Sequence, residues 1–128
     1  MKIVIFGGTG FVGLNVAEAL LARGHDVTLY DREELPSSAR RSLADYGARL
    51  KAVQGDITDA ATIDSLIAGG CDAIVLGAAV TAGDELERVS TARVLEINVM
   101  AQIPILLSAI RHGAVSYTHL TLPTNREV

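Results

Sequence analysis

Short apolar runs alternate with longer amphipathic segments along this chain. The apolar runs are rich in β-branched residues and end at glycines or polar turn residues, as strands buried on both faces do. We predict strands at residues 2–6, 25–31, 48–56 and 71–80. Between and after them, apolar residues recur at spacings of three and four, which is typical of helices. We predict helices at residues 11–23, 37–47, 58–70 and 84–113.

The ends of these segments carry cap and stop residues. Gly24 and Gly47 follow the first two helical patterns, and serine or aspartate residues precede the second and third. Pro104 lies inside the last pattern, where its ring removes one backbone hydrogen bond. We therefore expect that helix to kink or split near Met100.

Strands that alternate with helices favour a parallel sheet with right-handed crossovers and helices on both faces. In the dinucleotide-binding version of this architecture the spatial strand order is 3-2-1-4, with a fifth and sixth strand beyond the fourth. We predict a Rossmann-like, doubly wound α/β fold that is truncated after about four strands.

Composition narrows the class of protein further. The chain has 128 residues, 49% of them hydrophobic, which fits one globular domain. A net charge of -4 without a basic run argues against a nucleic-acid partner. Cys71 is the single cysteine, so the chain forms no internal disulfide, and we interpret it as a buried thiol. Because no apolar run is long enough for a signal peptide or a membrane span, we expect a cytoplasmic protein.

The turn after the first strand carries a glycine pattern suited to phosphates. Gly8-x-Gly10-x-x-Gly13 matches the dinucleotide-binding pattern, and Gly7-x-x-Gly10-x-x-Gly13 matches its more open variant. Such a turn needs positive φ, close approach of the backbone to pyrophosphate, and a small residue where the helix crosses the strand. The N–H groups that open the helix then face the phosphates. The candidate contacts are Gly7, Gly8, Thr9, Gly10, Phe11, Val12 and Gly13, unless the glycines serve packing alone.

Asp31 ends the second strand, where an acid meets the adenosine ribose in this architecture. A carboxylate there accepts from the ribose hydroxyls and repels a 2′-phosphate, which favours NAD over NADP. Arg32 is an opposing signal, because a guanidinium can bind that phosphate. The alternative for Asp31 is a solvated loop acid.

Together these residues resemble the extended short-chain dehydrogenase/reductase family, the NAD-dependent epimerases and dehydratases that act largely on nucleotide sugars. The resemblance runs from Met1 to about Ala114. The segment "GDITD" is similar to the family's stretch after the third strand, which implies that Asp56 and Ile57 contact the adenine. The alternative for Asp56 is a helix N-cap.

Two further segments extend the resemblance. "DAIVLGAAV" is similar to the family's fourth strand, and this implies that Gly77, Ala78 and Ala79 border the ribose and nicotinamide; tight packing would select the same residues. "LEINVMAQIPILLSAIRHGAV" is similar to a helix whose asparagine, here Asn98, shapes the helix and organises a proton relay; a surface asparagine is the alternative. The family's fourth and fifth helices often pair between subunits, which implies a homodimer of the intact protein.

The chain departs from the family in two places. Phe6 stands where many members carry threonine, and atypical relatives with this start include cofactor binders without catalysis. The family's acid/base is the tyrosine of a Tyr-x-x-x-Lys pair after strand five, whose lysine lowers the tyrosine pKa. Here the lysines are Lys2 and Lys51, and Tyr117 is followed four residues later by Thr121.

We therefore expect no catalytic residue in this chain, only the cofactor half of an NAD-dependent epimerase, dehydratase or reductase acting on a small molecule, with a nucleotide sugar as the candidate class. One alternative is a non-catalytic NAD(P) sensor or scaffold. Another is an α/β domain that binds a different phosphate ligand at the same helix terminus.

The C-terminal segment differs from the rest in composition. Codons for residues 115–124 can be written to match one reading frame of a transposon-type sequencing adapter, so we interpret residues 115–128 as a non-native tail and residues 1–114 as the incomplete cofactor domain. A genuine irregular C-terminus is the alternative. Since "VSYTHLTL" alternates and is rich in β-formers, it can fill the place beside the fourth strand. Without strands five and six, we expect poor solubility or a molten chain.

Overall fold

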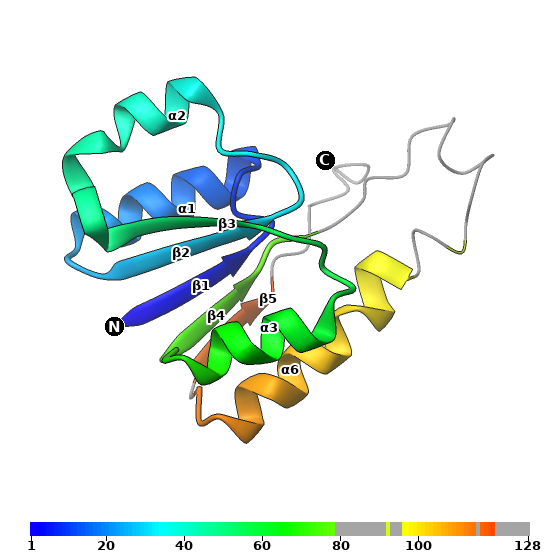
Figure 1. Ribbon diagram of the computed structural model, residues 1–128. Coiled ribbons are helices and arrows are strands. Elements are labelled where there is room, and N and C mark those ends of the chain that lie inside the picture. Colours follow the sequence, from blue (N-terminus) through cyan, green and yellow to red (C-terminus); the bar gives the residue numbers. More distant parts are fainter. Residues whose placement is uncertain (79–91, 93–95, 115, 120–128) are drawn as a thin grey trace, which may run out of the picture.

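A computed structural model describes residues 1–78, 92, 96–114 and 116–119. Its centre is a parallel sheet with the strand order β3-β2-β1-β4-β5 (Figure 1). The strands are β1 (Lys2–Phe6), β2 (Asp26–Asp31), β3 (Leu50–Gln54), β4 (Ala73–Leu76) and β5 (Ser116–His119). The predicted Rossmann-like order 3-2-1-4 is confirmed.

The fifth strand comes from the segment interpreted as non-native. Residues 116–119 pair in parallel with β4, from Ala73↔Ser116 to Leu76↔His119. The edge of β4 is therefore covered by backbone hydrogen bonds rather than open, as the alternating pattern of "VSYTHLTL" allowed. Backbone pairing of this kind is independent of where the segment comes from.

Helices cover both faces of the sheet. Figure 1 shows α1 (Phe11–Ala22) and α2 (Ser37–Ser42) on one face, and α3 (Ala60–Ala68) and α6 (Gln102–Arg111) on the other. This arrangement follows from right-handed crossovers, because the connections on the two sides of β1 run in opposite directions. Strand residues alternate between two cores. One core contains Ile3, Ile5, Ala17, Leu21, Val27 and Leu29, and the other contains Val4, Phe6, Tyr30, Ile63, Ile67 and Ile105.

The second predicted helix is broken. α2 ends at Ser42, and a 3₁₀ segment, η1 (Ala44–Arg49), follows it. Gly47 has a φ of 57°, a left-handed conformation that interrupts the helical path. The predicted end at Gly47 thus marks a real interruption, but the prediction of one continuous helix over residues 37–47 was wrong, because α2 already ends at Ser42. The predicted serine cap was also wrong, since the N-cap of α2 is Pro36 and no side chain caps it.

The last predicted helix splits where Pro104 requires it. A π-helical turn, η2 (Glu96–Met100), precedes α6, and the Ala101 N–H donates to the Glu96 carbonyl at 2.7 Å. Pro104 has no N–H for the Met100 carbonyl, and its ring crowds that carbonyl. The expected break near Met100 is confirmed, while residues 84–91 and 93–95 lie outside the described residues.

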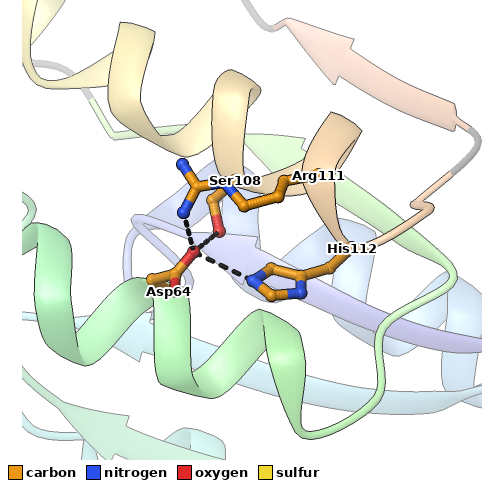
Figure 2. A network of polar contacts seen from close by, with 4 residues as sticks. All are labelled: Asp64, Ser108, Arg111 and His112. Carbon is orange, nitrogen blue, oxygen red and sulfur yellow. Dashed lines mark hydrogen bonds and ion pairs between the residues drawn. The ribbon is translucent and has the colours of Figure 1, made fainter.

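A polar cluster ties α6 to α3. Figure 2 shows the side chains of Ser108, Arg111 and His112 converging on Asp64 of α3. Asp64 Oδ1 accepts from Ser108 Oγ at 2.6 Å and from an Arg111 guanidinium nitrogen at 3.1 Å, and His112 Nε2 lies 3.0 Å away. Although serine, histidine and aspartate meet here, the serine hydroxyl bonds the carboxylate and not the imidazole, so the cluster lacks the relay of a hydrolytic triad.

Two sequence interpretations concern the rest of the described chain. Cys71 is half-buried just before β4, and burial raises the pKa of its thiol, which keeps it in the less reactive protonated form. No described helix combines the length and the apolar character needed to cross a membrane.

Candidate cofactor-binding site

A cavity of about 280 Å³ opens at the carboxyl ends of the strands. Its lining comes from the segments at the ends of β1, β2, β3 and β4, and so includes the point between β1 and β4 where the strand order reverses, the usual ligand position in doubly wound sheets. Its lining is Gly7, Gly10, Tyr30, Asp31, Arg32, Glu33, Gly55, Asp56, Ile57, Gly77, Ala78 and Ile97. A larger hollow of about 420 Å³ is lined in part by residues at the opposite, amino ends of the strands, such as Lys2 and Asp26, whereas ligands of this architecture bind at the carboxyl ends.

Three glycines of the first turn are required by the protein's own packing. Gly7 has a φ of 77°, and a Cβ on it would lie 2.6 Å from the Ala78 nitrogen. A Cβ on Gly13 would lie 2.5 Å from the Gly7 carbonyl oxygen, and one on Gly8 would lie 2.8 Å from the Leu29 side chain. At these three positions, packing alone is enough to explain why the residue is glycine.

Gly10 is different. A Cβ there would meet the Gly7 carbonyl oxygen at 3.6 Å, an ordinary van der Waals distance. Its backbone, with φ of -77° and ψ of 172°, suits any residue, and it is the N-cap of α1 without a side-chain cap bond. Gly10 nevertheless lines the cavity. The space beside it fits a ligand that must approach the backbone closely, as a pyrophosphate does at a helix N-terminus.

Asp31 is held at the edge of the cavity rather than loose in solvent. Its Oδ2 accepts from the Thr9 N–H and its Oδ1 from the Glu33 N–H, both at 3.1 Å. The carboxylate therefore links the glycine turn to the loop after β2. Next to it, the Gln54 amide donates to the Arg32 carbonyl at 3.0 Å, which fixes that backbone as well.

The segment after β3 forms one wall. Asp56 Oδ1 accepts from the Thr58 N–H at 2.8 Å and from its hydroxyl at 2.7 Å, which closes a tight turn. The N-cap of α3 is Asp59, whose carboxylate accepts from the Thr62 N–H at 3.2 Å, so the N-cap alternative for Asp56 is wrong. Asp56 faces the cavity together with Ile57.

The segment after β4 forms the opposite wall. Gly77 donates its N–H to the Phe6 carbonyl at 2.8 Å, and the Gln102 amide of α6 donates to the Ala78 carbonyl at 3.1 Å. Ile97, from the π turn, is 7% exposed and closes this side. Ala79 lies outside the described residues.

The remaining predicted residues that the structure describes are not part of the cavity lining. This group comprises Gly8, Thr9, Phe11, Val12, Gly13 and Asn98. Phe11 is 85% exposed, so its predicted role rests on the N–H groups that open α1. Asn98 is half-buried within η2.

Sequence patterns missed Tyr30, Glu33, Gly55 and Ile97 in the lining. A Cβ on Gly55 would clash with the ring of Tyr30, so this glycine and the tyrosine are matched. Tyr30 also explains Phe6: both are fully buried, and their rings meet edge to face with centroids 5.6 Å apart. Phe6, which stands where many members of the family carry threonine, thus packs against Tyr30.

Comparisons with known proteins show the family of the chain. The model of the NAD dependent epimerase/dehydratase family matches residues 3–121, and the chain belongs to this family. It is 38% identical over 115 residues to the dTDP-glucose 4,6-dehydratase of Mycolicibacterium smegmatis, covering 88% of this chain and 34% of that protein. With the UDP-glucose 4-epimerase of Corynebacterium glutamicum it shares 32% identity over 114 residues, 88% of this chain and 32% of the relative.

Solved structures share the fold. The UDP-glucose-4-epimerase of Stenotrophomonas maltophila, solved with bound NAD, matches with a TM-score of 0.81 and 23% identity over 93% of this chain and 36% of that chain. The chain thus spans about a third of the length of the curated relatives.

Proposed function

We propose that residues 1–114 are the NAD-binding half of an epimerase, dehydratase or reductase, with a nucleotide sugar as the candidate substrate class. The observation that carries this proposal is the space around Gly10. The protein's own packing leaves room for a side chain at this position, whereas a pyrophosphate bound in the cavity would require a glycine there. Asp31 at the cavity edge supports it, because the ribose of a dinucleotide needs an acceptor there.

The lining suggests how NAD would lie. Asp56 and Ile57 would hold the adenine, Asp31 the adenosine ribose, and the Gly7–Gly13 turn with the start of α1 the pyrophosphate. Gly77 and Ala78 would border the nicotinamide ribose. We keep Ala79 as a candidate contact of the nicotinamide side and Asn98 as a candidate organiser of the proton relay. When bound, NAD supplies a ring that accepts a hydride from a substrate carbon. The chain's own contribution is to bind and orient this group.

We propose that the acid/base of the reaction belongs to sequence beyond residue 114. These 128 residues contain no Tyr-x-x-x-Lys, so the chain itself should bind NAD without catalysing hydride transfer. Reading the source DNA past codon 114 tests this. A frame that continues into a Tyr-x-x-x-Lys pair supports both the enzyme and the non-native tail. A frame that encodes residues 115–128 and then stops contradicts both.

The alternative function, a non-catalytic sensor, was favoured by Phe6, whose ring is buried against Tyr30. A sequence beyond residue 114 without a Tyr-x-x-x-Lys pair would select this alternative. The decisive experiment is calorimetric titration of the chain with NAD, NADP and inorganic pyrophosphate. We expect NAD to bind most tightly, because the Asp31 carboxylate repels a 2′-phosphate. Equal affinity for NAD and pyrophosphate would instead indicate a plain phosphate site.

Substitution at Asp31 sharpens the same experiment. Asp31→Asn removes the negative charge, so the preference for NAD over NADP should fall about tenfold. Glu34→Gln is a matched control, since it removes an exposed neighbouring charge outside the cavity lining and leaves the bonds from the Thr9 and Glu33 N–H groups to Asp31 in place. An unchanged preference in Asp31→Asn would contradict the assignment of Asp31 to the ribose.

A further inference from the structure

We propose that Tyr30 and Gln102 are positioning residues that hold the two opposite walls of the cavity where a dinucleotide needs them. This inference rests on the proposed NAD site. Each is a buried polar side chain, and each donates to the backbone carbonyl of a wall residue: the Tyr30 hydroxyl to Asp56 at 2.8 Å, and the Gln102 amide to Ala78 at 3.1 Å. Both walls begin where a strand has ended, outside the hydrogen-bond ladder of the sheet, and the Asp56 carbonyl also accepts from the Asp59 N–H at 3.1 Å.

Tyr30 supports the wall after β3 from the buried side. It is 1% exposed, and its ring is fixed by the edge-to-face contact with Phe6. A Cβ on Gly55 would lie 2.6 Å from the ring carbon Cζ, so the backbone of the wall rests directly on the tyrosine. Burial raises the pKa of Tyr30, which keeps the hydroxyl protonated and able to donate.

Gln102 supports the wall after β4 from the side of α6. It is 7% exposed, an unusual burial for a glutamine, and its amide reaches across to the Ala78 carbonyl. The other side of Ala78 packs against the phosphate turn, since its nitrogen would be 2.6 Å from a Cβ on Gly7. The cluster on Asp64 is a separate contact of α6, which joins it to α3 (Figure 2) through residues that do not line the cavity.

Because the walls serve different halves of the dinucleotide, the two residues have separable effects. Tyr30→Phe removes only the hydroxyl and keeps the ring, and Gln102→Leu keeps the bulk without the donor. We expect Tyr30→Phe to weaken AMP and NAD about three- to tenfold and to leave nicotinamide mononucleotide unchanged. Gln102→Leu should weaken nicotinamide mononucleotide and NAD by a similar factor and leave AMP unchanged.

The experiment is calorimetry of the full 128-residue chain with these three ligands, alongside thermal melts. Ser108→Ala is the matched control, because Ser108 is a buried donor on the same helix but bonds Asp64 away from the cavity. It should lower the melting temperature without changing any affinity. If either cavity variant weakens AMP and nicotinamide mononucleotide equally, or behaves like Ser108→Ala, the positioning role is overturned.

Hydrogen exchange of the ligand-free chain separates this inference from the proposed function. Tyr30→Phe should speed exchange at residues 55–58, and Gln102→Leu should speed it at residues 77–78, each at least threefold. If the wild-type chain binds no NAD but these local changes appear, the walls are held as proposed and the NAD site is wrong. Unchanged exchange in both variants would overturn the positioning role whatever the chain binds.

Discussion

At the scale of single residues, the glycines of the first turn have different reasons to be glycine. Gly7 and Gly13 leave no room for a Cβ against neighbouring backbone. Gly10 has that room, and its backbone angles are ordinary. The distinction separates residues that the fold requires from a residue that a ligand would require, and substitution can test it.

Gly10→Ala should therefore fold as well as the wild-type chain but bind NAD at least tenfold more weakly, since its Cβ would occupy the pyrophosphate's path. Its free energy of unfolding should stay within about 1 kcal/mol of wild type, or rise, because alanine has less entropy to lose. Thermal melts and calorimetry measure the two effects. Gly13→Ala is the contrast, and it should lose stability. Undiminished NAD binding by Gly10→Ala would count against the site.

At the scale of elements, the π turn before α6 brings Ile97 to the cavity. The turn exists where Pro104 cannot donate to Met100, and the Ala101 N–H instead reaches back to Glu96. π turns are frequent at functional sites because they rotate side chains relative to a regular helix. The proline thus connects a local backbone constraint to the shape of the site.

Pro104→Ala should allow a regular helix through residues 96–104 and turn Ile97 away from the cavity, because removing a π turn rotates the preceding residues by about 100°. We expect helicity by circular dichroism to be equal or higher, and NAD affinity to fall about three- to tenfold. A variant at a neighbouring exposed position, Ile103→Ala, should leave NAD affinity unchanged. Wild-type affinity in Pro104→Ala would show that the π turn is not needed for the site.

The contact between α3 and α6 should depend on pH. The hydrogen bond from Ser108, followed by the contacts with His112 and Arg111, lowers the pKa of Asp64 below its ordinary value. A lowered pKa means that the stabilisation is complete above the pKa of the unfolded chain and is lost as pH falls through the folded pKa. Asp64→Asn should lower the melting temperature at neutral pH, and the difference from wild type should shrink below about pH 4.

Ser108→Ala provides the check on this explanation. This substitution removes the hydrogen bond that contributes most to the lowered pKa of Asp64. The pKa should then move back toward its ordinary value, so the loss of stability should begin at higher pH. Melts between pH 3 and pH 7 would show it. A difference between wild type and Asp64→Asn that stays constant over this range would rule out the carboxylate as its source.

At the scale of the whole molecule, five large exposed apolar side chains lie along α6 and the turn before it, and we call them the α6 row. They are Val99, Met100, Ile103, Leu107 and Ile110. At about 100° per residue, Ile103, Leu107 and Ile110 lie on the side of α6 away from Ser108 and His112, which contact α3. Because β5 pairs with β4 and covers its edge, we expect the α6 row, and not the β4 edge, to be the apolar surface that associates.

We expect the 128-residue chain to self-associate through this row, as apolar patches of this kind do. Leu107→Glu combined with Ile110→Lys should shift the chain toward monomer in analytical ultracentrifugation and leave the melting temperature within a few degrees of wild type. Arg40→Gln, an exposed change on the other face of the sheet, should have no effect. A wild-type chain that sediments as a monomer would contradict this expectation.

The strand order was predicted from the dinucleotide-binding architecture that the alternation of strands and helices matches, and the role of Asp31 stays a prediction. That alternation, the glycine turn after β1 and the break at Pro104 were determined by the sequence itself. These features depend on local rules: the period of apolar residues, the sterics of glycine and the missing N–H of proline. Each can be recognised within a few neighbouring residues, so no knowledge of distant contacts was needed.

Only the tertiary structure decided which residues form the walls and which glycine is free. Tyr30 and Gln102 reach carbonyls 26 and 24 residues away, Phe6 pairs with Tyr30 from another strand, and α3 is capped by Asp59 and not by Asp56. Such contacts join segments that are adjacent only after the sheet forms. The space around Gly10 is likewise set by the packing of other segments, because a pattern of glycines does not show which of them a neighbour already crowds.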